Sequence, residues 1–320
     1  MKLTNDQIRA LTFGAVYSEE ENGIIRFYKC TKNQIAAWGA IREVLGERAM
    51  QTSGIRMDLH TNSKTISFDA RSKVDVYING LLRHSLNMGD GERATLELCD
   101  PLGYPLEDAR VTIIFSSHGN CYVTNVELDD GCYVTPHQYD TKILFIGDSI
   151  TQGWNTTFNS KRYDSLSYAW RVSRFFNADC VIHGVGGGIF HKSVFDKIDF
   201  DPDTVILAFG TNDFRLSKTI GDLRKNASEF MDLIAEEYKG KKIFLISPIW
   251  RAEQQAPMGS FKDCRDTVID ECLRHGFIHI DGLSLVPPCP DFFSDETVHP
   301  NAVGFGIYAE NLIKELLKYL

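Results

Sequence analysis

No stretch of the chain approaches the roughly 18 uninterrupted apolar residues that a membrane-spanning helix needs. The first residues, MKLTNDQIRALTFGAV, place acidic and polar side chains where the apolar centre of a signal peptide would lie. We therefore expect a cytoplasmic protein with no membrane partner.

Clusters of basic residues and metal-binding motifs are also missing. The formal net charge is −9, and Lys and Arg are scattered without forming a basic stripe, which disfavours nucleic-acid binding. The eight cysteines include no Cys-x-x-Cys and no tight Cys/His cluster. We expect buried free thiols, since free Cys behaves as a small core hydrophobe, and no metal site.

The first part of the chain has a hydrophobic period of two, which is typical of half-buried antiparallel strands. The side chains expected to point inward are Ile66, Phe68, Val74, Val76, Ile78, Leu96, Leu98, Val111, Ile113 and Phe115. Turns are expected at 79–80 (NG), 89–91 (GDG) and 100–105 (DPLGYP). The pattern predicts a β-sandwich or jelly roll, interrupted by a helical segment, TKNQIAAWGAIREVLG.

The second part alternates apolar runs with helical stretches. The runs are KILFIGD, DCVIHGV, TVILAFG, KIFLISP and FIHIDG, and the clearest helix covers 219–238. This alternation predicts a parallel sheet covered on both sides, with a site at the carboxyl ends of its strands. With 320 residues, we expect two domains, a β-sandwich over 1–135 and an α/β domain over 136–320.

Residues suited to acyl transfer follow several of these strands. Ser149, in FIGDSITQGW, comes directly after the first strand and is either a nucleophile or a helix cap. Asn212, in GTND after the third strand, can donate to an oxyanion or form a turn. A glycine-rich turn, GVGGGIF, follows the second strand, and its spacing does not fit a dinucleotide fingerprint. His299 follows the fifth strand and precedes a proline.

The order of these four features resembles the SGNH, or GDSL, hydrolases. The matching blocks are GDSI at 147–150, HGVGGG at 183–188, GTND at 210–213 and the Asp/Glu pair before the histidine. The resemblance implies a flavodoxin-like three-layer domain with a five-stranded parallel sheet, and a serine esterase that needs no cofactor. It also implies that Ser149 is the nucleophile, that His299 is the base, and that the N–H groups of Ser149 and Gly187 form an oxyanion hole with Asn212. Gly186 competes with Gly187, because three consecutive glycines leave the register open.

The group that orients His299 departs from the family pattern. The family usually places Asp three residues before its His, where this chain has Glu296, and Asp295 lies four before. We favour Asp295, because a one-residue bulge would restore its position. The alternatives are Glu296 and a backbone carbonyl, which would leave a Ser–His dyad.

The whole chain, with a jelly roll before the hydrolase domain, resembles carbohydrate esterase family two, whose members remove acetyl groups from polysaccharides. The resemblance implies an acetyl esterase that acts on an acylated carbohydrate or another small ester. Trp154 and Trp250 are candidates for contacts with a sugar, the alternative being core packing. Two other functions are weighed: a lipid or thioester acylhydrolase using the same site, and a carbohydrate-binding protein with an inert hydrolase domain. The presence of Ser149, Asn212 and His299 disfavours the inert protein.

Overall fold

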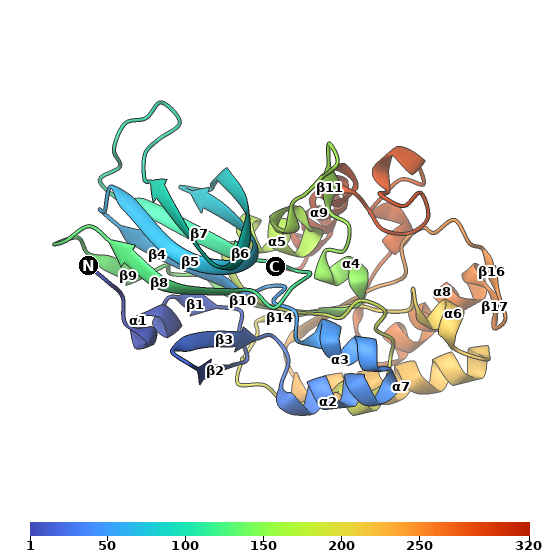
Figure 1. Cartoon of the computed structure of the whole chain (residues 1–320). Helices are drawn as coiled ribbons and strands as arrows, with labels where there is room; N and C mark the ends of the chain where they lie inside the picture. The colour runs from blue at the N-terminus through green and yellow to red at the C-terminus, as the bar shows by residue number, and fades with distance from the viewer. The chain divides into compact units, whose positions relative to one another are not determined.

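The computed structural model describes residues 1–320, which form two compact units (Figure 1). The first unit comprises Met1–Cys30 and Met50–Tyr139, and the second comprises Thr31–Ala49 and Asp140–Leu320. Residues 31–49 thus belong to the α/β unit, whereas the sequence prediction placed them in the sandwich. The chain passes from one unit to the other after residue 139, four residues beyond the predicted boundary at 135.

The first unit is built on a seven-stranded sheet in which all strand pairs are antiparallel. The strands are β1 (Thr12–Phe13), β4 (Arg56–Thr61), β5 (Thr65–Ile78), β6 (Leu81–Glu97), β7 (Ala109–Phe115), β8 (Tyr122–Leu128) and β9 (Val134–Pro136). A helix and a separate hairpin precede most of them: α1 (Asn5–Ala10), β2 (Tyr17–Glu21) and β3 (Ile24–Tyr28). All ten side chains predicted to point inward are buried, which confirms the period-two pattern. The predicted antiparallel β-sandwich is confirmed as well.

One predicted turn is correct and another is wrong. Asn79 and Gly80 connect β5 to β6, and both have positive φ, 48° and 78°, as a tight hairpin turn requires. Residues 89–91 instead lie inside β6, where they face a register shift between Ala70 and Ser72 of β5. A β-bulge uses glycine as readily as a turn does, so the composition of 89–91 did not distinguish the two.

The second unit contains the predicted five-stranded parallel sheet, with strand order β13-β10-β14-β15-β18. The strands are β10 (Thr141–Gly147), β13 (Ala178–Gly184), β14 (Thr204–Ala208), β15 (Lys242–Ile246) and β18 (Ile278–Ile280). In chain order this is 2-1-3-4-5, the order of flavodoxin-like sheets. The order in which successive strands are added to the sheet reverses at β10, so the carboxyl ends of β10, β13 and β14 meet where such folds bind ligands.

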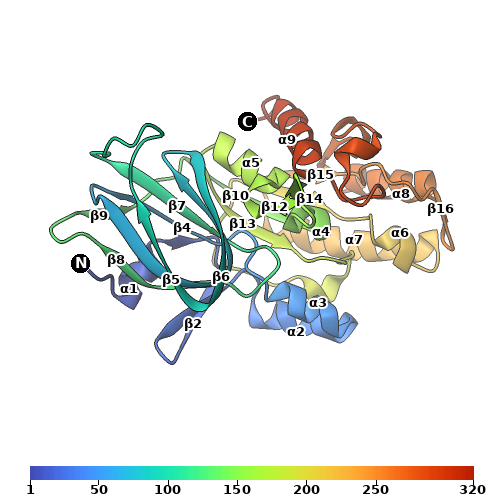
Figure 2. The same ribbon diagram turned by 45° about the horizontal axis from the view of Figure 1, so that its top comes forward.

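Helices cover both faces of this sheet (Figure 2). The main helices are α4 (Ser149–Gln152), α5 (Tyr168–Phe175), α6 (Asp213–Leu216), α7 (Ile220–Glu237), α8 (Phe261–Arg274) and α9 (Ala302–Leu316). The rings of Tyr168 on α5 and Tyr308 on α9 stack 4.3 Å apart, and both side chains are buried. In Figures 1 and 2, α7 lies on the opposite side of the sheet from α5 and α9. The apolar face predicted for 219–238 is buried at Leu223, Ala227, Phe230, Met231 and Ile234.

Shorter elements complete the second unit. They are the hairpins β11 (Thr157–Phe158) with β12 (Lys161–Arg162) and β16 (Gln255–Ala256) with β17 (Gly259–Ser260), and four 3₁₀ turns at Asp164–Leu166, Lys192–Val194, Gly282–Ser284 and Pro290–Phe292. All eight cysteines are free, and five are buried, as expected from their spacing. No helix combines the length and the apolar character that a membrane crossing requires.

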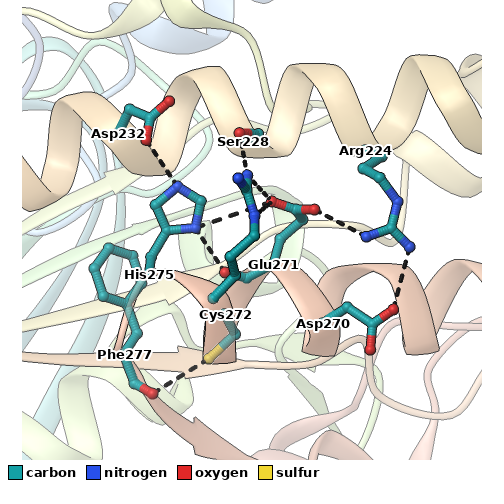
Figure 3. A network of polar contacts seen from close by, with 9 residues as sticks. Arg224, Ser228, Asp232, Asp270, Glu271, Cys272, His275 and Phe277 are labelled. Atoms are coloured by element: carbon teal, nitrogen blue, oxygen red, sulfur yellow. Dashed lines mark hydrogen bonds and ion pairs between the residues drawn. The ribbon is translucent and has the colours of Figure 1, made fainter.

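A polar network joins α7 to α8 (Figure 3). The side chain of Glu271 on α8 is 1% exposed, and its Oε1 accepts a hydrogen bond of 2.9 Å from Arg224 on α7. Arg274 donates to Glu271 Oε2, and His275 Nε2 lies 3.0 Å from a carboxylate oxygen of Asp232 on α7. A buried carboxylate needs such partners, so this network holds the two helices together.

Residues 31–49 form α2 (Lys32–Ile41) and α3 (Glu43–Ala49). The two helices pack closely, since a Cβ placed on Gly46 would lie 3.0 Å from the Cα of Gly39. Trp38 is 4% exposed, and its ring packs against that of Phe209, with centroids 6.5 Å apart. Thr31 Oγ1 donates to Asp196 at 2.6 Å. These contacts explain why the segment belongs to the second unit.

Candidate active site

Ser149 lies at the junction of β10 and α4. Asp148 is the N-cap residue, and its Oδ1 accepts the N–H of Ile150 at 2.9 Å. Ser149 is the first residue of the helix, and its Oγ lies 2.9 Å from Nε2 of His299. The cap alternative for Ser149 is therefore wrong, because Asp148 provides the cap. The close approach of α4 to β13 requires Gly184, where a Cβ would lie 2.3 Å from the backbone N of Gln152.

Asp295 is the carboxylate that contacts His299. Its Oδ2 lies 2.5 Å from Nδ1 of the imidazole, and its Oδ1 accepts the backbone N–H groups of Thr297, Val298 and His299 at 3.0, 2.9 and 3.1 Å. Burial acts to raise the pKa of Asp295, but these hydrogen bonds hold it well below its usual range. A carboxylate accepts only, so Nδ1 carries the proton and Nε2 is free to accept one from Ser149.

Glu296 takes no part in this contact. It is exposed and has a φ of 56°, a left-handed conformation that is uncommon for residues other than glycine. This local turn brings Asp295, four residues before His299, to the imidazole. The structure thus joins Ser149, His299 and Asp295 in one hydrogen-bonded chain.

In the glycine-rich turn after β13, the N–H groups of Gly186 and Gly187 differ in their hydrogen bonds. The N–H of Gly186 donates to Oε1 of Gln152 at 2.7 Å, so this group is already used. Gly188 donates to Val185 at 2.8 Å. The N–H groups of Gly187 and Ser149 have no acceptor within the protein. Gly187 has a φ of 84°, which places its peptide in an orientation that glycine adopts without strain.

Asn212 follows β14, and its side chain is oriented by the same turn. Nδ2 donates to the carbonyl oxygen of Gly188 at 3.1 Å, which leaves the second amide hydrogen for another acceptor. The next residue, Asp213, accepts the N–H of Phe190 through Oδ1 and that of Gly210 through Oδ2, both at 3.1 Å. Asp213 therefore links the glycine-rich turn to the turn that carries Asn212.

Two buried carboxyl groups flank these turns. Burial raises the pKa of Asp148 to about 6, although its hydrogen bond from Ile150 and the nearby charges of His299 and Arg251 act to lower it. Burial, assisted by the charge of Asp148, raises the pKa of Asp213 to about 8, against the lowering effect of its backbone hydrogen bonds. Strongly shifted carboxyl groups of this kind cluster at functional sites.

Both candidate tryptophans are half-buried rather than fully packed in the core. The backbone N–H of Trp154 donates to the carbonyl of Ser149 at 2.8 Å, and the guanidinium carbon of Arg48 lies 5.1 Å from the Trp154 ring centroid. The ring of Trp250 packs against that of Phe293 at 5.0 Å. Trp154 is therefore tied directly to the Ser149 helix, whereas Trp250 has no such direct contact.

The profile of the GDSL-like lipase/acylhydrolase family matches residues 145–307, which include Ser149, Asn212 and His299. The chain belongs to this family. The fold and the family that the motifs indicated are thereby confirmed. No curated protein matches the GDSL-family chain in sequence.

Solved structures with the same fold cover nearly the whole chain. A salicylyl-acyltransferase, SsfX3, from a tetracycline biosynthetic pathway has a TM-score of 0.81 at 19% identity, with 100% of this chain and 98% of that one covered. A GDSL-like lipase from Bacteroides ovatus has a TM-score of 0.75 at 17% identity, with 99% and 98% covered. A family two carbohydrate esterase from Cellvibrio japonicus has a TM-score of 0.65 at 14% identity, with 99% and 96% covered. At these identities the likeness establishes the shared fold, including the N-terminal sandwich.

Sequence reasoning missed several residues around this GDSL-family site. Gln152 fixes the register of the glycines, and Asp213 links two turns, although GTND already contained Asp213 next to Asn212. Arg42 and Arg48 donate to the carbonyl oxygens of Gly187 and Gly186 at 3.4 and 2.7 Å. No sequence motif marks these arginines, because they come from a segment more than 100 residues before the turn that they contact.

Proposed function

We propose that this protein is a serine esterase that hydrolyses acetyl esters of carbohydrates through a covalent acyl-enzyme. The observation that carries the proposal is the hydrogen-bonded chain from Ser149 Oγ through His299 to Asp295. A serine next to a base that is oriented by a carboxylate is the arrangement that activates a hydroxyl for attack on an ester.

In the first step, Nε2 of His299 takes the proton of the Ser149 hydroxyl while Oγ forms a bond to the ester carbonyl carbon. Asp295 fixes the imidazole tautomer and stabilises the imidazolium that forms. His299 then gives its proton to the leaving alcohol oxygen as the ester C–O bond breaks. Water repeats the sequence on the acyl-enzyme, and acetate leaves with Ser149 restored.

The negative charge on the carbonyl oxygen needs donors that are not already used. The N–H groups of Ser149 and Gly187 and the second amide hydrogen of Asn212 meet this requirement. Gly186 does not, because Gln152 accepts its N–H. Three such donors stabilise the tetrahedral intermediate more than they stabilise the planar substrate.

Two features support an acetylated carbohydrate as substrate. The two-unit chain shares its fold with family two carbohydrate esterases from Cellvibrio japonicus and Clostridium thermocellum. The half-buried Trp154, whose backbone bonds to Ser149, offers an aromatic ring of the kind on which sugar rings pack.

The test is release of acetate from acetylated xylan, acetylated mannan and simple acetylated sugars, with Ser149→Ala as the matched control. We expect release by the native protein and none by the variant, with both folded by circular dichroism. Equal release by both would remove Ser149 as nucleophile. A series of nitrophenyl esters of increasing chain length separates the alternatives, because a lipid acylhydrolase would be faster on long chains than on acetate.

A further inference from the structure

Two arginines converge on the turn that carries the Gly187 N–H. A Cβ placed on Gly187 would lie 3.0 Å from Arg42 Nη2 and 3.2 Å from Arg48 Nη1. Arg42 ends α2 and Arg48 lies in α3, so both come from the segment that packs on Phe209 through Trp38. Buried contacts of the α/β unit therefore hold the backbone that carries these two arginines, of which Arg42 is exposed and Arg48 half-buried.

Neither arginine has an acidic partner. Arg42 donates to Gly187 O at 3.4 Å and Arg48 to Gly186 O at 2.7 Å, and neither forms an ion pair. A guanidinium has five N–H donors, so most of the donors on both side chains are left for another acceptor. The chain carries 43 acidic and 34 basic residues. Acidic residues are abundant in the sequence, and Glu47 acts on the charge of Arg48 without forming an ion pair with it.

Arg48 is held in place by a second contact, over the ring of Trp154 at 5.1 Å. Burial and the charge of Arg42 lower the pKa of Arg48, against the effect of Glu47. Two neighbouring cations repel each other, and holding a loop carbonyl requires only a neutral donor. A purely structural role therefore leaves the paired charge unexplained, whereas an anion bound between the two guanidinium groups would relieve the repulsion.

We propose that Arg42 and Arg48 form a subsite for a carboxylate on the substrate, so that the enzyme prefers acetylated acidic sugars to neutral ones. The planar guanidinium matches a carboxylate with two parallel hydrogen bonds. The guanidinium of Arg48 lies over the ring of Trp154, and the backbone N–H of Trp154 donates a hydrogen bond to the carbonyl oxygen of Ser149. These two contacts link the subsite to the residue that attacks the ester. The inference rests on the proposed esterase function and adds the class of substrate.

Two pairs of esters test the subsite and locate the carboxylate. One pair is an acetylated uronic acid and the matching acetylated neutral sugar, and the other is 4-nitrophenyl hemisuccinate and 4-nitrophenyl butyrate. We expect the native enzyme to prefer the uronic acid by at least about tenfold in kcat/KM, with the preference falling as salt is added. A preference confined to the hemisuccinate would overturn the preference for acidic sugars, because it would place the carboxylate on the acyl group. Ratios near one in both pairs would overturn the proposal.

Variants test whether Arg42 and Arg48 cause the preference for the uronic acid. The double variant Arg42→Gln/Arg48→Gln should bring the ratio of the two kcat/KM values within about twofold of one. Arg48→Lys keeps the charge but cannot form two parallel hydrogen bonds, so it should retain only part of the preference. Lys239→Gln, which removes an exposed positive charge just beyond α7, should leave the ratio unchanged. If the double variant still prefers the uronic acid to the neutral sugar, the assignment of the subsite to Arg42 and Arg48 is wrong. If the native protein hydrolyses none of the four esters, the proposed esterase function itself is wrong.

Discussion

Asp295 contacts Nδ1 of His299 at 2.5 Å from four residues earlier in the chain, through a turn in which Glu296 has a φ of 56°. The left-handed residue acts as a one-residue bulge. It directs the Asp295 carboxylate toward the imidazole and leaves the Glu296 side chain exposed.

Asp295→Ala should lower kcat by at least about tenfold, because the imidazolium formed during attack loses the carboxylate that stabilises it. Glu296→Ala, the matched control in the same turn, should change kcat little. Steady-state kinetics on a nitrophenyl acetate measures both. A larger loss in the Glu296 variant would show that the turn rearranges in the active enzyme, and two mild effects would indicate a Ser149–His299 dyad.

Asn212→Ala should lower kcat by about 100-fold or more with little change in KM, since the second amide hydrogen is used mainly in the transition state. The variant also removes the contact with Gly188 O. Asn212→Asp keeps an oxygen acceptor in place of the donor and should be at least as inactive. A raised KM with kcat preserved would make Asn212 a substrate-binding residue instead.

The pattern of apolar residues was sufficient to predict the main sheet of each unit, because strands with one buried face alternate apolar and polar residues, whereas strands with two buried faces are continuously apolar. Side chains from Ile66 to Phe115 on that pattern are buried as predicted. The site was predictable in outline, since parallel strands end at one edge of the sheet and bring Ser149 and Asn212 together.

Other features depend on contacts that local sequence does not specify. The helical character of residues 31–49 was visible, but the choice of core depends on Trp38 meeting Phe209, more than 150 residues away. The register of the three glycines depends on Gln152, whose side chain accepts from Gly186 and not from Gly187. Such choices are made by tertiary packing, after the helices and strands are already defined.

The network in Figure 3 predicts unequal roles for two neighbouring carboxylates on α8. Glu271→Ala should lower the free energy of unfolding by about 2 kcal/mol, because a buried acceptor of bonds from Arg224 and Arg274 is lost. Asp270 pairs with the same Arg224 but is 62% exposed, so Asp270→Ala should cost less than about 1 kcal/mol. Urea denaturation compares the two. Equal costs would mean that Glu271 gains nothing from its partners beyond what a surface pair provides.

Asp213 should make the stability of the protein depend on pH. Its pKa is raised from 3.8 to about 8 in the folded state. The protonated carboxyl group therefore contributes its full stabilisation of the folded protein below about pH 4, and this stabilisation is lost as the pH rises to about 8. Asp213→Asn cannot titrate and can accept only one of the two N–H groups, from Phe190 and Gly210, that Asp213 accepts. The variant should therefore be less stable than the native protein at pH 5, and the difference between their free energies of unfolding should be smaller by at least about 1 kcal/mol at pH 8.5.

Urea denaturation of both proteins at the two pH values measures this gap in unfolding free energy. Asp270→Asn, on the exposed surface of α8, controls for the general effect of removing a carboxylate. A gap that stays constant would mean that Asp213 is ionised in the folded protein and that its backbone hydrogen bonds outweigh its burial.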